Sequence, residues 1–417
     1  MKFFSLMLGL ATAVGTAMPV AADTLYKNGF WFKDGTFQQQ DVYVKEGRFS
    51  NPQAATANSK VVDVTGLYLL PPFAEGHNHQ LQNAWLVNRF SAKYVADGIL
   101  YGLMLGGDAF SAQQARQQLA ADGRLDVLIS GTTVTSSDGH PLQMILQPGP
   151  DGVVPTKQQV LDKWVIAVDS LADIDSKMPL MVQGKPQLVK LILVHSEDDS
   201  RRNNAKFDGV NGLRPELVKP LVKKLQQQQI RVIAHTESAA DFAVAVEAGV
   251  DSVAHLPGYH WWAGKTAADY RLSDDAIATA KAKQVAVLTT TGLTSLFKLP
   301  PAELKQVQAL QKSNLQRLQA QGVTLLVGSD RFDSNVLSEI YYLDALQVLS
   351  RGDLLKMLVQ HTPQFIFPTR QIGKISPGYE ASFVAVKQNP LQQMTALNDV
   401  VLRVRQGKEL SVSQPAG

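Results

Sequence analysis

Short apolar runs alternate with amphipathic segments through the middle of the chain. The apolar runs have the length of strands and carry apolar residues at consecutive positions, which is typical of parallel strands buried on both faces. Between them, apolar residues recur at the spacing of one helix face. We expect strands that end at His79 and that span 101–105, 125–133, 188–194, 231–235, 252–255, 285–290 and 323–329. The expected helices span 111–121 with Ser111 as N-cap, 157–172, 214–229, 238–248, 274–283, 301–320 and 337–349.

This succession predicts an α/β fold, and specifically a (β/α)8 TIM-like barrel over residues 71–370. Eight strand–helix units over roughly 300 residues are what such a barrel requires. A doubly wound open sheet is the competing fold. No Gly-x-Gly-x-x-Gly follows a predicted strand and the sequence has no phosphate-binding loop, so the barrel is favoured.

The two ends of the chain predict a separate small β domain. Residues 23–70 read as short strands with turn residues such as Asn28-Gly29 between them. Strands this short have no core of their own, so they need partners elsewhere. The C-terminal residues 371–417 offer matching apolar segments at 382–386 and 400–404. We therefore expect one β-sandwich built from both ends beside the barrel.

The first 22 residues have the pattern of an export signal. Lys2 precedes an apolar stretch, and Val20-Ala21-Ala22 has the small residues of a cleavage site. An uncleaved anchor is the alternative, but the apolar stretch is too short to cross a bilayer, and no later one reaches about 18 uninterrupted apolar residues. We expect a cleaved signal peptide, a periplasmic or secreted protein, and no membrane span in the mature chain.

Composition narrows the functional classes. Hydrophobic residues make up 45% and charged residues 18% of the 417 positions, as in ordinary globular proteins. The formal net charge is only +3 and no basic cluster stands out, so nucleic acid is a poor partner. The chain has no cysteine, which excludes disulfides and thiolate metal ligands.

Residues that can bind metal end several predicted strands. Active sites of (β/α)8 barrels lie at the C-terminal strand ends. His77 and His79 are two residues apart in one strand and so point to the same side. His235, His255 and Asp330 end three later strands, so that four of the eight histidines fall at three strand ends.

A lysine lies among these strands as well. Lys190 is inside the apolar strand 188–194, where a charged amine is costly unless it is paired or chemically changed. Carboxylation by carbon dioxide would turn it into an anionic carbamate able to bridge two cations. Each residue also has a simpler explanation: a hydrogen-bonded core histidine for His235 or His255, a barrel rim for Lys190, a helix cap for Asp330. Their joint placement favours a metal site.

At these residues the chain resembles the amidohydrolase superfamily, closest to its imidazolonepropionase-like and Xaa-Pro-dipeptidase-like members. The resemblance covers most of the chain: the N-terminal strands, His77-x-His79, Lys190, His235, His255, Asp330 and the closing segment 372–384. It implies a distorted barrel beside a small β-sandwich made from both ends. There are departures: Pro72 and Glu75 replace a usual Gly and Asp, and Ser382 replaces a common Asp. These departures remove no metal ligand, but they weaken any inference of the substrate from the family.

The resemblance implies two divalent metal ions, and zinc suits imidazole and carboxylate ligands. By this resemblance His77, His79 and Asp330 hold one ion, and the other is held by His235 and His255. N6-carboxylated Lys190 bridges both. Two cations would lower the pKa of a bridging water and supply hydroxide. Asp330 would take its proton and deliver it to the leaving group.

Further residues beyond the strand ends are candidate substrate contacts: His140, His195, Tyr259 and His260. His140 resembles a loop histidine that contacts substrate in related enzymes, and with Asp330 it is the catalytic candidate. The other three could equally be surface loop residues. Trp261-Trp262 would suit an apolar substrate wall, although loop packing explains the pair as well.

The expected function is hydrolysis of a C–N amide bond in a small molecule such as a dipeptide, an N-acyl amino acid or a cyclic amide. The first alternative is a mononuclear deaminase of the same superfamily, in which Lys190 stays an ordinary amine. A non-catalytic periplasmic solute-binding protein is the second, and an inactive barrel that has kept its ligands is the third. The oligomeric state stays open, although members of this superfamily often form homo-oligomers.

Overall fold

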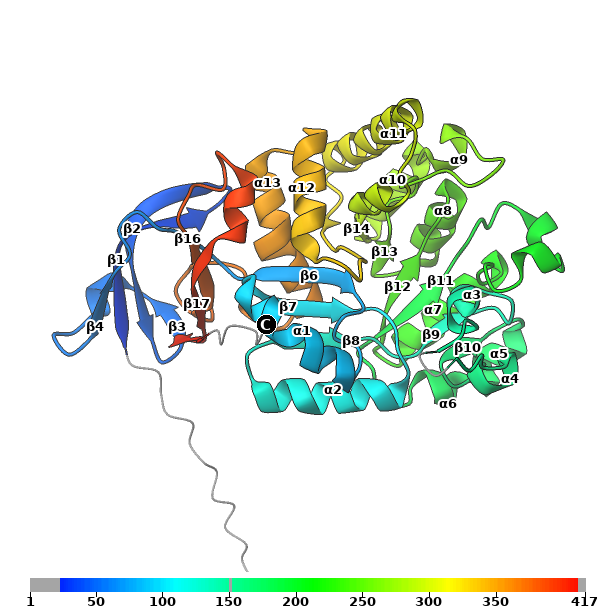
Figure 1. Ribbon diagram of the computed structural model, residues 1–417, viewed down its shortest axis with the longest axis horizontal. Helices are drawn as coiled ribbons and strands as arrows, with labels where there is room; N and C mark the ends of the chain where they lie inside the picture. The colour runs from blue at the N-terminus through cyan, green and yellow to red at the C-terminus, as the bar shows by residue number, and fades with distance from the viewer. Residues whose placement is uncertain (1–22, 150–151, 412–417) are drawn as a thin grey trace, which may run out of the picture.

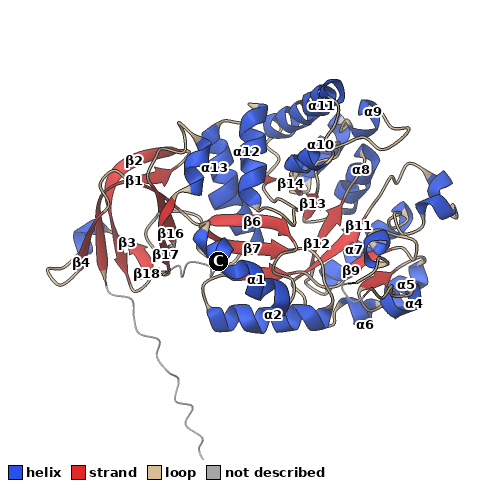
Figure 2. Ribbon diagram, in the orientation of Figure 1, coloured by secondary structure: helices blue, strands red, loops and turns tan. Residues whose placement is uncertain are grey.

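The computed structural model describes residues 23–149 and 152–411. Figures 1 and 2 show two parts: a group of strands from both ends of the chain, and a larger part in which helices surround central strands. The predicted export signal, residues 1–22, lies outside the described residues.

The strands are β1 Thr24–Lys33, β2 Thr36–Lys45, β3 Arg48–Ser50, β4 Lys60–Asp63, β5 Tyr68–Leu70, β6 Phe73–Asn78, β7 Ile99–Met104, β8 Asp126–Ile129, β9 Thr133–Thr135, β10 Val165–Ala167, β11 Leu188–Ile192, β12 Arg231–His235, β13 Ser252–Ala254, β14 Ala286–Leu288, β15 Leu325–Leu326, β16 Phe383–Val386, β17 Val400–Arg405 and β18 Lys408–Glu409.

The α-helices are α1 Ala84–Ala96, α2 Ala109–Asp122, α3 Leu142–Ile145, α4 Lys157–Val160, α5 Leu171–Ser176, α6 Met178–Met181, α7 Pro215–Gln227, α8 Ala239–Ala248, α9 Ala267–Tyr270, α10 Asp274–Ala282, α11 Pro301–Ala320, α12 Val336–Leu346, α13 Arg351–Lys356 and α14 Thr362–Ile366.

Both ends of the chain share one eight-stranded sheet, as predicted. Its order is β18-β17-β16-β5-β1-β2-β3, with β4 paired to β1. In Figure 1 the blue N-terminal strands lie beside the red C-terminal ones. The joining pair is β5 with β16, in antiparallel register from Val384 opposite Leu70 to Val386 opposite Tyr68. A single connected sheet is found where two facing sheets of a sandwich were expected.

This terminal sheet curls around its own aromatic core. Phe49 of β3 and Phe383 of β16 are four strands apart in the sheet order, yet their ring centroids are 6.2 Å apart. A flat sheet with strands about 4.8 Å apart would separate them by roughly 19 Å. Trp31, with no exposed surface, packs edge-on against both rings. Curling therefore gives the sheet the enclosed core that a sandwich would have provided.

The larger part contains parallel sheets, which confirms the α/β class. One sheet has seven strands in the order β10-β9-β11-β12-β13-β14-β15, and the other has three in the order β6-β7-β8. Two hydrogen bonds connect the sheets: the amide of Gly76 donates to the carbonyl of Val327 at 3.0 Å, and that of Gly131 donates to the carbonyl of Leu188 in β11 at 2.7 Å. The hydrogen-bonded ladder is thus divided into two sheets and is not one continuous closed barrel.

Most predicted elements are found within a few residues, with four corrections. Helix 157–172 is wrong: α4 ends at Val160, and β10 pairs with β9 in the middle of that range, because sheet pairing overrides local helix propensity. The N-cap of α2 is Asp108, whose carboxylate accepts from two amides, and not Ser111. Strand 125–133 breaks into β8 and β9, and helix α1, capped by Asn83, was not predicted.

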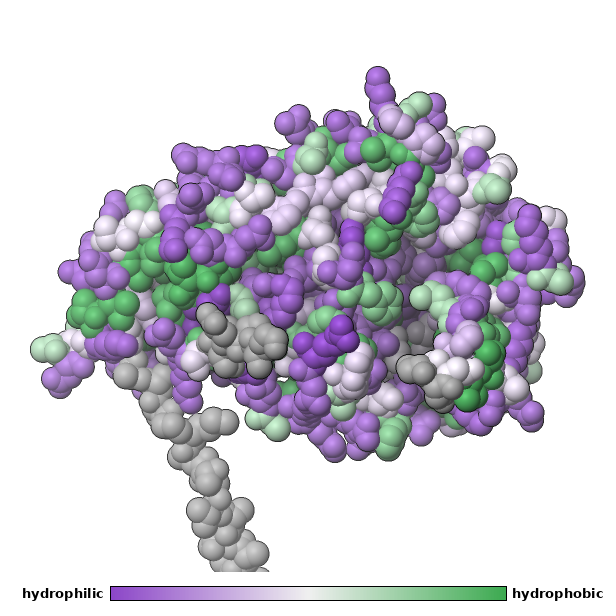
Figure 3. Space-filling model, viewed as in Figure 1, coloured by the Kyte–Doolittle hydropathy of each residue, from purple (hydrophilic) through white to green (hydrophobic). Residues whose placement is uncertain are grey.

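No helix within the described ranges is long and apolar enough to cross a membrane. On the face shown in Figure 3, hydrophilic residues predominate and hydrophobic ones form separate patches, one of them over the terminal sheet at the left. The division of the chain into a β domain and a barrel domain stays a prediction.

Glycines allow β6 and β15 to approach each other. A Cβ atom on Gly328 would lie 2.5 Å from the amide nitrogen of His77, closer than any real contact. We expect Gly328→Ala to lower the free energy of unfolding by about 1–3 kcal/mol, because overpacking forces the strands apart. Gly102→Ala is the control, since the atom nearest to its Cβ would be the flexible end of Met104 at 3.3 Å, and Val127 would lie at ordinary contact distances of 3.5 and 3.7 Å. Equal urea midpoints for the two variants would contradict the account.

An ion-pair network joins the terminal sheet to the parallel sheets. Arg370 binds Glu380 at 2.7 Å and Asp126 of β8 at 3.0 Å, and Arg405 of β17 binds Asp126 at 2.8 Å. Burial raises the pKa of Glu380, but the hydrogen bonds from Arg370 and Gln406 lower it by more. The net pKa therefore lies below its ordinary value.

A carboxyl group whose pKa is lowered by folding stabilises the protein above its unfolded pKa, and this contribution is lost as the pH falls through the folded pKa. Glu380→Gln is therefore expected to destabilise the protein at neutral pH by about 1–3 kcal/mol. The difference from the wild type should shrink below about pH 4. Urea unfolding at a series of pH values measures this, and a difference that does not change with pH would refute it.

Candidate metal centre

Three side chains from different strand ends meet at one point. His77, His255 and Asp330 offer ligand atoms that all lie within 4.8 Å of one another. Oδ1 of Asp330 is 3.4 Å from Nε2 of His77 and 3.1 Å from Nε2 of His79, and its Oδ2 is 3.7 Å from Nε2 of His255. The carboxylate of Asp330 therefore faces three imidazoles at once.

The remaining predicted ligands adjoin this group. Nζ of Lys190 is 3.2 Å from Nε2 of His77, inside the parallel sheets and almost fully buried. The rings of His235 and His255 have centroids 4.6 Å apart, and His140 stacks on His235 at 5.0 Å. The structure thus brings together the whole predicted set: His77, His79, His140, Lys190, His235, His255 and Asp330. Whether they bind metal stays a prediction.

Burial lowers the pKa of His77, His255 and Lys190 and so favours their neutral forms, and histidines of the set also have nitrogen atoms left free within the described chain. Within the described residues, Nδ1 of His235 and Nε2 of His255 are buried and have no hydrogen-bond partner. Burial lowers the pKa of His255 to about 3 and is also the main cause of the lowered pKa of Lys190. Neutral imidazoles are the forms that bind metal, and a neutral amine is the form that carboxylation needs. The residues are therefore suited to bind divalent metal ions.

Strained backbone holds the ends of β13, β14 and β15 at this centre. His255, Thr290 and Asp330 adopt positive φ angles of 85°, 45° and 48°. Such conformations cost non-glycine residues about 1–3 kcal/mol each, and active sites often contain several of them. Nδ1 of His255 is also hydrogen-bonded to Oγ1 of Thr290 at 2.6 Å, which leaves Nε2 directed toward Asp330.

Glu75, the departure noted before the His-x-His pair, lies directly below the centre. Its carboxyl group accepts hydrogen bonds from the amides of His77 at 3.1 Å and Ser329 at 2.8 Å, and from the hydroxyl of Ser329 at 2.8 Å. Burial raises its pKa to about 8. Glu75 therefore joins β6 to the segment after β15 while His77 and Asp330 point into the site.

Sequence reasoning missed Glu237, a buried carboxylate beside His235. It is hydrogen-bonded to Nε2 of His235 at 3.0 Å and accepts from the hydroxyl of Tyr259 at 2.6 and 2.7 Å and from Nε1 of Trp262 at 3.1 Å. Burial raises its pKa, but these partners, His235 first, lower it to a net value below the ordinary one. The His-x-Glu spacing after β12 was the available signal.

The other two candidate contacts have different surroundings. His195 is buried. Its backbone amide donates to the carboxylate of Asp241 at 2.8 Å, and its Nδ1 is hydrogen-bonded to Glu197 at 3.0 Å. The same oxygen of Asp241 also accepts from the amide of Glu237 at 3.0 Å. His260 lies with its ring 4.0 Å from that of Phe297, beyond Tyr259. His195 thus lies in a polar network that is joined to Glu237 through Asp241, whereas His260 adjoins the centre through Tyr259.

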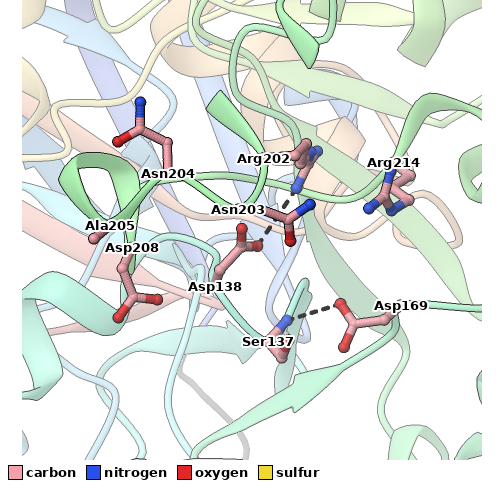
Figure 4. Close-up of a pocket in the computed structure, with 9 residues that line it drawn as sticks. All are labelled: Ser137, Asp138, Asp169, Arg202, Asn203, Asn204, Ala205, Asp208 and Arg214. Atoms are coloured by element: carbon pink, nitrogen blue, oxygen red, sulfur yellow. Dashed lines mark hydrogen bonds and ion pairs between the residues drawn. The ribbon is translucent and has the colours of Figure 1, made fainter. Parts of the chain in front are cut away.

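A polar cavity of about 580 Å³ lies beside the loop that carries His140 (Figure 4). Arg202 pairs with Asp138 at 3.4 Å across it, and the amide of Ser137 donates to Asp169 at 3.0 Å. The lining residues are Ser137, Asp138, Asp169, Arg202, Asn203, Asn204, Ala205, Asp208 and Arg214. None of the predicted ligands lines it, and the sequence pattern did not indicate it.

The sequence is similar to ochratoxinase of Aspergillus niger, with 24% identity over 337 residues. The match covers 78% of this chain and 65% of that relative, so the chain spans about two thirds of the curated relative's length. No family model matches the sequence.

Solved structures share the fold over nearly the whole chain. A Xaa-Pro dipeptidase with bound methionine has a TM-score of 0.72 at 15% identity, over 93% of this chain and 100% of that one. The crystal structure of A. niger ochratoxinase has a TM-score of 0.72 at 14% identity, over 94% and 96%. A prolidase complexed with N-methylphosphonate-L-proline has 0.70 at 15%, over 93% and 99%. The resemblance to amidohydrolases is thereby confirmed at the level of the fold.

Lys190 gives a test of whether this centre is built for function at the expense of stability. A buried amine without an anionic partner in direct contact is costly, so Lys190→Met is expected to stabilise the metal-free protein by about 1–3 kcal/mol. Thermal unfolding after chelator treatment and dialysis measures the change.

Lys408→Met serves as the control, because Lys408 is exposed and its replacement should change stability by less than about 0.5 kcal/mol. A metal-free Lys190→Met protein that melts below the wild type would show that the amine stabilises the fold.

Proposed function

We propose that the protein is a metal-dependent hydrolase that cleaves a C–N amide bond of a small molecule. The observation that carries this proposal is the convergence of His77, His79, Lys190, His235, His255 and Asp330 at the C-terminal ends of parallel strands. The similarity to ochratoxinase, a prolidase and a Xaa-Pro dipeptidase supports it. In this proposal the two parallel sheets are the halves of a distorted barrel, beside a β-sandwich-like terminal domain.

His77, His79 and Asp330 would hold one divalent ion and His235 and His255 the other, with zinc as the metal and N6-carboxylated Lys190 between them. Bound ions would supply Lewis-acid polarisation of the amide carbonyl and activation of water.

The protein's own groups would carry out the proton transfers and the positioning. Asp330 is the only carboxylate of the described chain placed against all three imidazoles of the ligand group, and it would accept the proton of the attacking water and pass it to the leaving nitrogen. Burial lowers the pKa of His140 to about 3, and its Nδ1 accepts a hydrogen bond from the side-chain amide of Gln143 at 2.9 Å, so its Nε2–H would be the donor to the substrate carbonyl. Glu237 would keep His235 in one orientation, with Nδ1 unprotonated.

We further propose that the protein is exported, with residues 1–22 as its signal peptide. The proposed substrates include dipeptides, N-acyl amino acids and cyclic amides, because each of these would place a carbonyl group and a leaving nitrogen at the centre. A mononuclear deaminase is the second candidate, because the tightest ligand group comprises only His77, His255 and Asp330.

Metal analysis separates these candidates. The zinc-loaded wild type is expected to contain two ions per chain, and Lys190→Ala about one or none, because the bridging ligand is lost. Hydrolysis of a dipeptide and N-acyl amino acid panel should fall by a factor of 100 or more in this variant and in the chelated wild type.

His361→Gln is the matched control, since His361 lies outside the ligand group and should keep both ions. One ion per chain in the wild type, unchanged in Lys190→Ala, together with ammonia release from aminated substrates, would favour the deaminase and overturn the two-metal hydrolase.

A further inference from the structure

Aromatic rings form a continuous group on one side of the metal centre. The ring of Tyr259 is 5.9 Å from that of His255 and 5.8 Å from that of Phe297. His260 follows, with its ring 4.0 Å from Phe297 and 4.4 Å from Trp262. The group begins in contact with a predicted ligand and extends outward from it.

The outer members of this group are exposed to solvent, unlike core aromatics. Trp262 is 44% and Phe297 39% exposed, and the adjoining Leu296 is 49% exposed. Each exposed ring adds unfavourable contact with water. Contiguous exposed apolar side chains beside a polar centre are therefore typical of a binding surface, whereas single exposed ones are common everywhere.

The rings are held in place before any ligand arrives. Glu237 accepts hydrogen bonds from both Tyr259 and Trp262, and the hydroxyl of Thr294 donates to the carbonyl of Tyr259 at 2.6 Å. One carboxylate thus fixes the predicted ligand His235 and two members of the aromatic group together. A preorganised apolar surface loses little conformational entropy on binding.

A further ring lies by the solvent-accessible side of the centre. Phe332, 59% exposed, stacks on His79 with a centroid distance of 5.7 Å. The side chains of His79 and Asp330 are 19% and 20% exposed to solvent, so solvent reaches the centre at this side. Both the approach at Phe332 and the surface at Tyr259 are therefore aromatic.

We propose that Tyr259, His260, Trp262 and Phe297 form a subsite for an aromatic group carried by the substrate beside its scissile amide. The subsite rests on the proposed amide hydrolysis for its catalytic consequence, but not for its existence as a binding surface. A flat ring that stacks on aromatic side chains gains dispersion attraction and buries apolar surface to an extent that a methyl group cannot match. The substrate class is thereby narrowed to amides with an aryl or comparably large flat apolar group.

The test compares amides that differ only in ring content. N-naphthoylglycine and N-acetylglycine are hydrolysed in parallel by the zinc-loaded full-length protein. Phe297→Ala is expected to lower the ratio of kcat/KM for the naphthoyl over the acetyl substrate about tenfold, through the loss of one stacking partner. Phe297→Tyr keeps the ring and should keep the ratio. Phe297 touches no predicted ligand, so the fold and metal content should be unaffected.

Trp164→Ala is the matched control: Trp164 is a 48% exposed aromatic next to the start of β10, away from the ligand-bearing strand ends, and its loss should leave the ratio unchanged. An equal loss for both substrates in Phe297→Ala, or the same change of ratio in Trp164→Ala, would overturn the subsite.

Calorimetric titration with N-naphthoylglycine separates the two proposals. If no amide is hydrolysed, the proposed function fails, while about tenfold weaker binding to Phe297→Ala than to Trp164→Ala still supports the subsite. Identical binding to both variants refutes it.

Discussion

The contact between β6 and the segment after β15 is the constraint on which the rest of the site depends. Gly76 and Gly328 remove the side chains that would hold these segments apart, and the amide of Asp330 donates to the carbonyl of His77 at 2.7 Å. Glu75 adds two hydrogen bonds across the same contact, from the amide and the hydroxyl of Ser329. Residues some 250 positions apart in the chain are thereby fixed within bonding distance of each other, and the remaining ligands arrive on strands already in register with these.

Much of this arrangement was legible in the sequence because it depends on strand periodicity. Strand β12 and helix α11 have the predicted bounds. The His-x-His pair lies at the end of β6 and His255 directly follows β13, as expected, whereas Asp330 lies four residues beyond the end of β15. A parallel strand places its last residue at one edge of the sheet, so residues at strand ends converge without any knowledge of the loops. The resemblance to amidohydrolases added roles to positions that the spacing had already singled out.

What the sequence did not show depends on long-range contacts. The helix predicted across Val165 is a strand because β9 lies alongside and supplies backbone partners. Glu237 directly precedes Ser238, the N-cap of α8, and only the fold places it among His235, Tyr259 and Trp262. The polar cavity at Arg202 likewise arises from loops whose conformation local pattern does not encode. These features arise from contacts between residues distant in the sequence and from loop conformation, for which periodicity gives no information.

The pairing of β5 with β16 also affects how this protein can reach its native state. More than 300 residues separate the two strands, so the terminal sheet cannot be completed until nearly the whole polypeptide has been synthesised. Contacts of such high sequence separation form late and slowly, because the chain between them must first be ordered. Until then β5 keeps an unpaired edge, which is the kind of surface on which nascent chains aggregate. Chain release and folding of the sheet are therefore coupled, and molecular chaperones that shield strand edges should matter most during that interval.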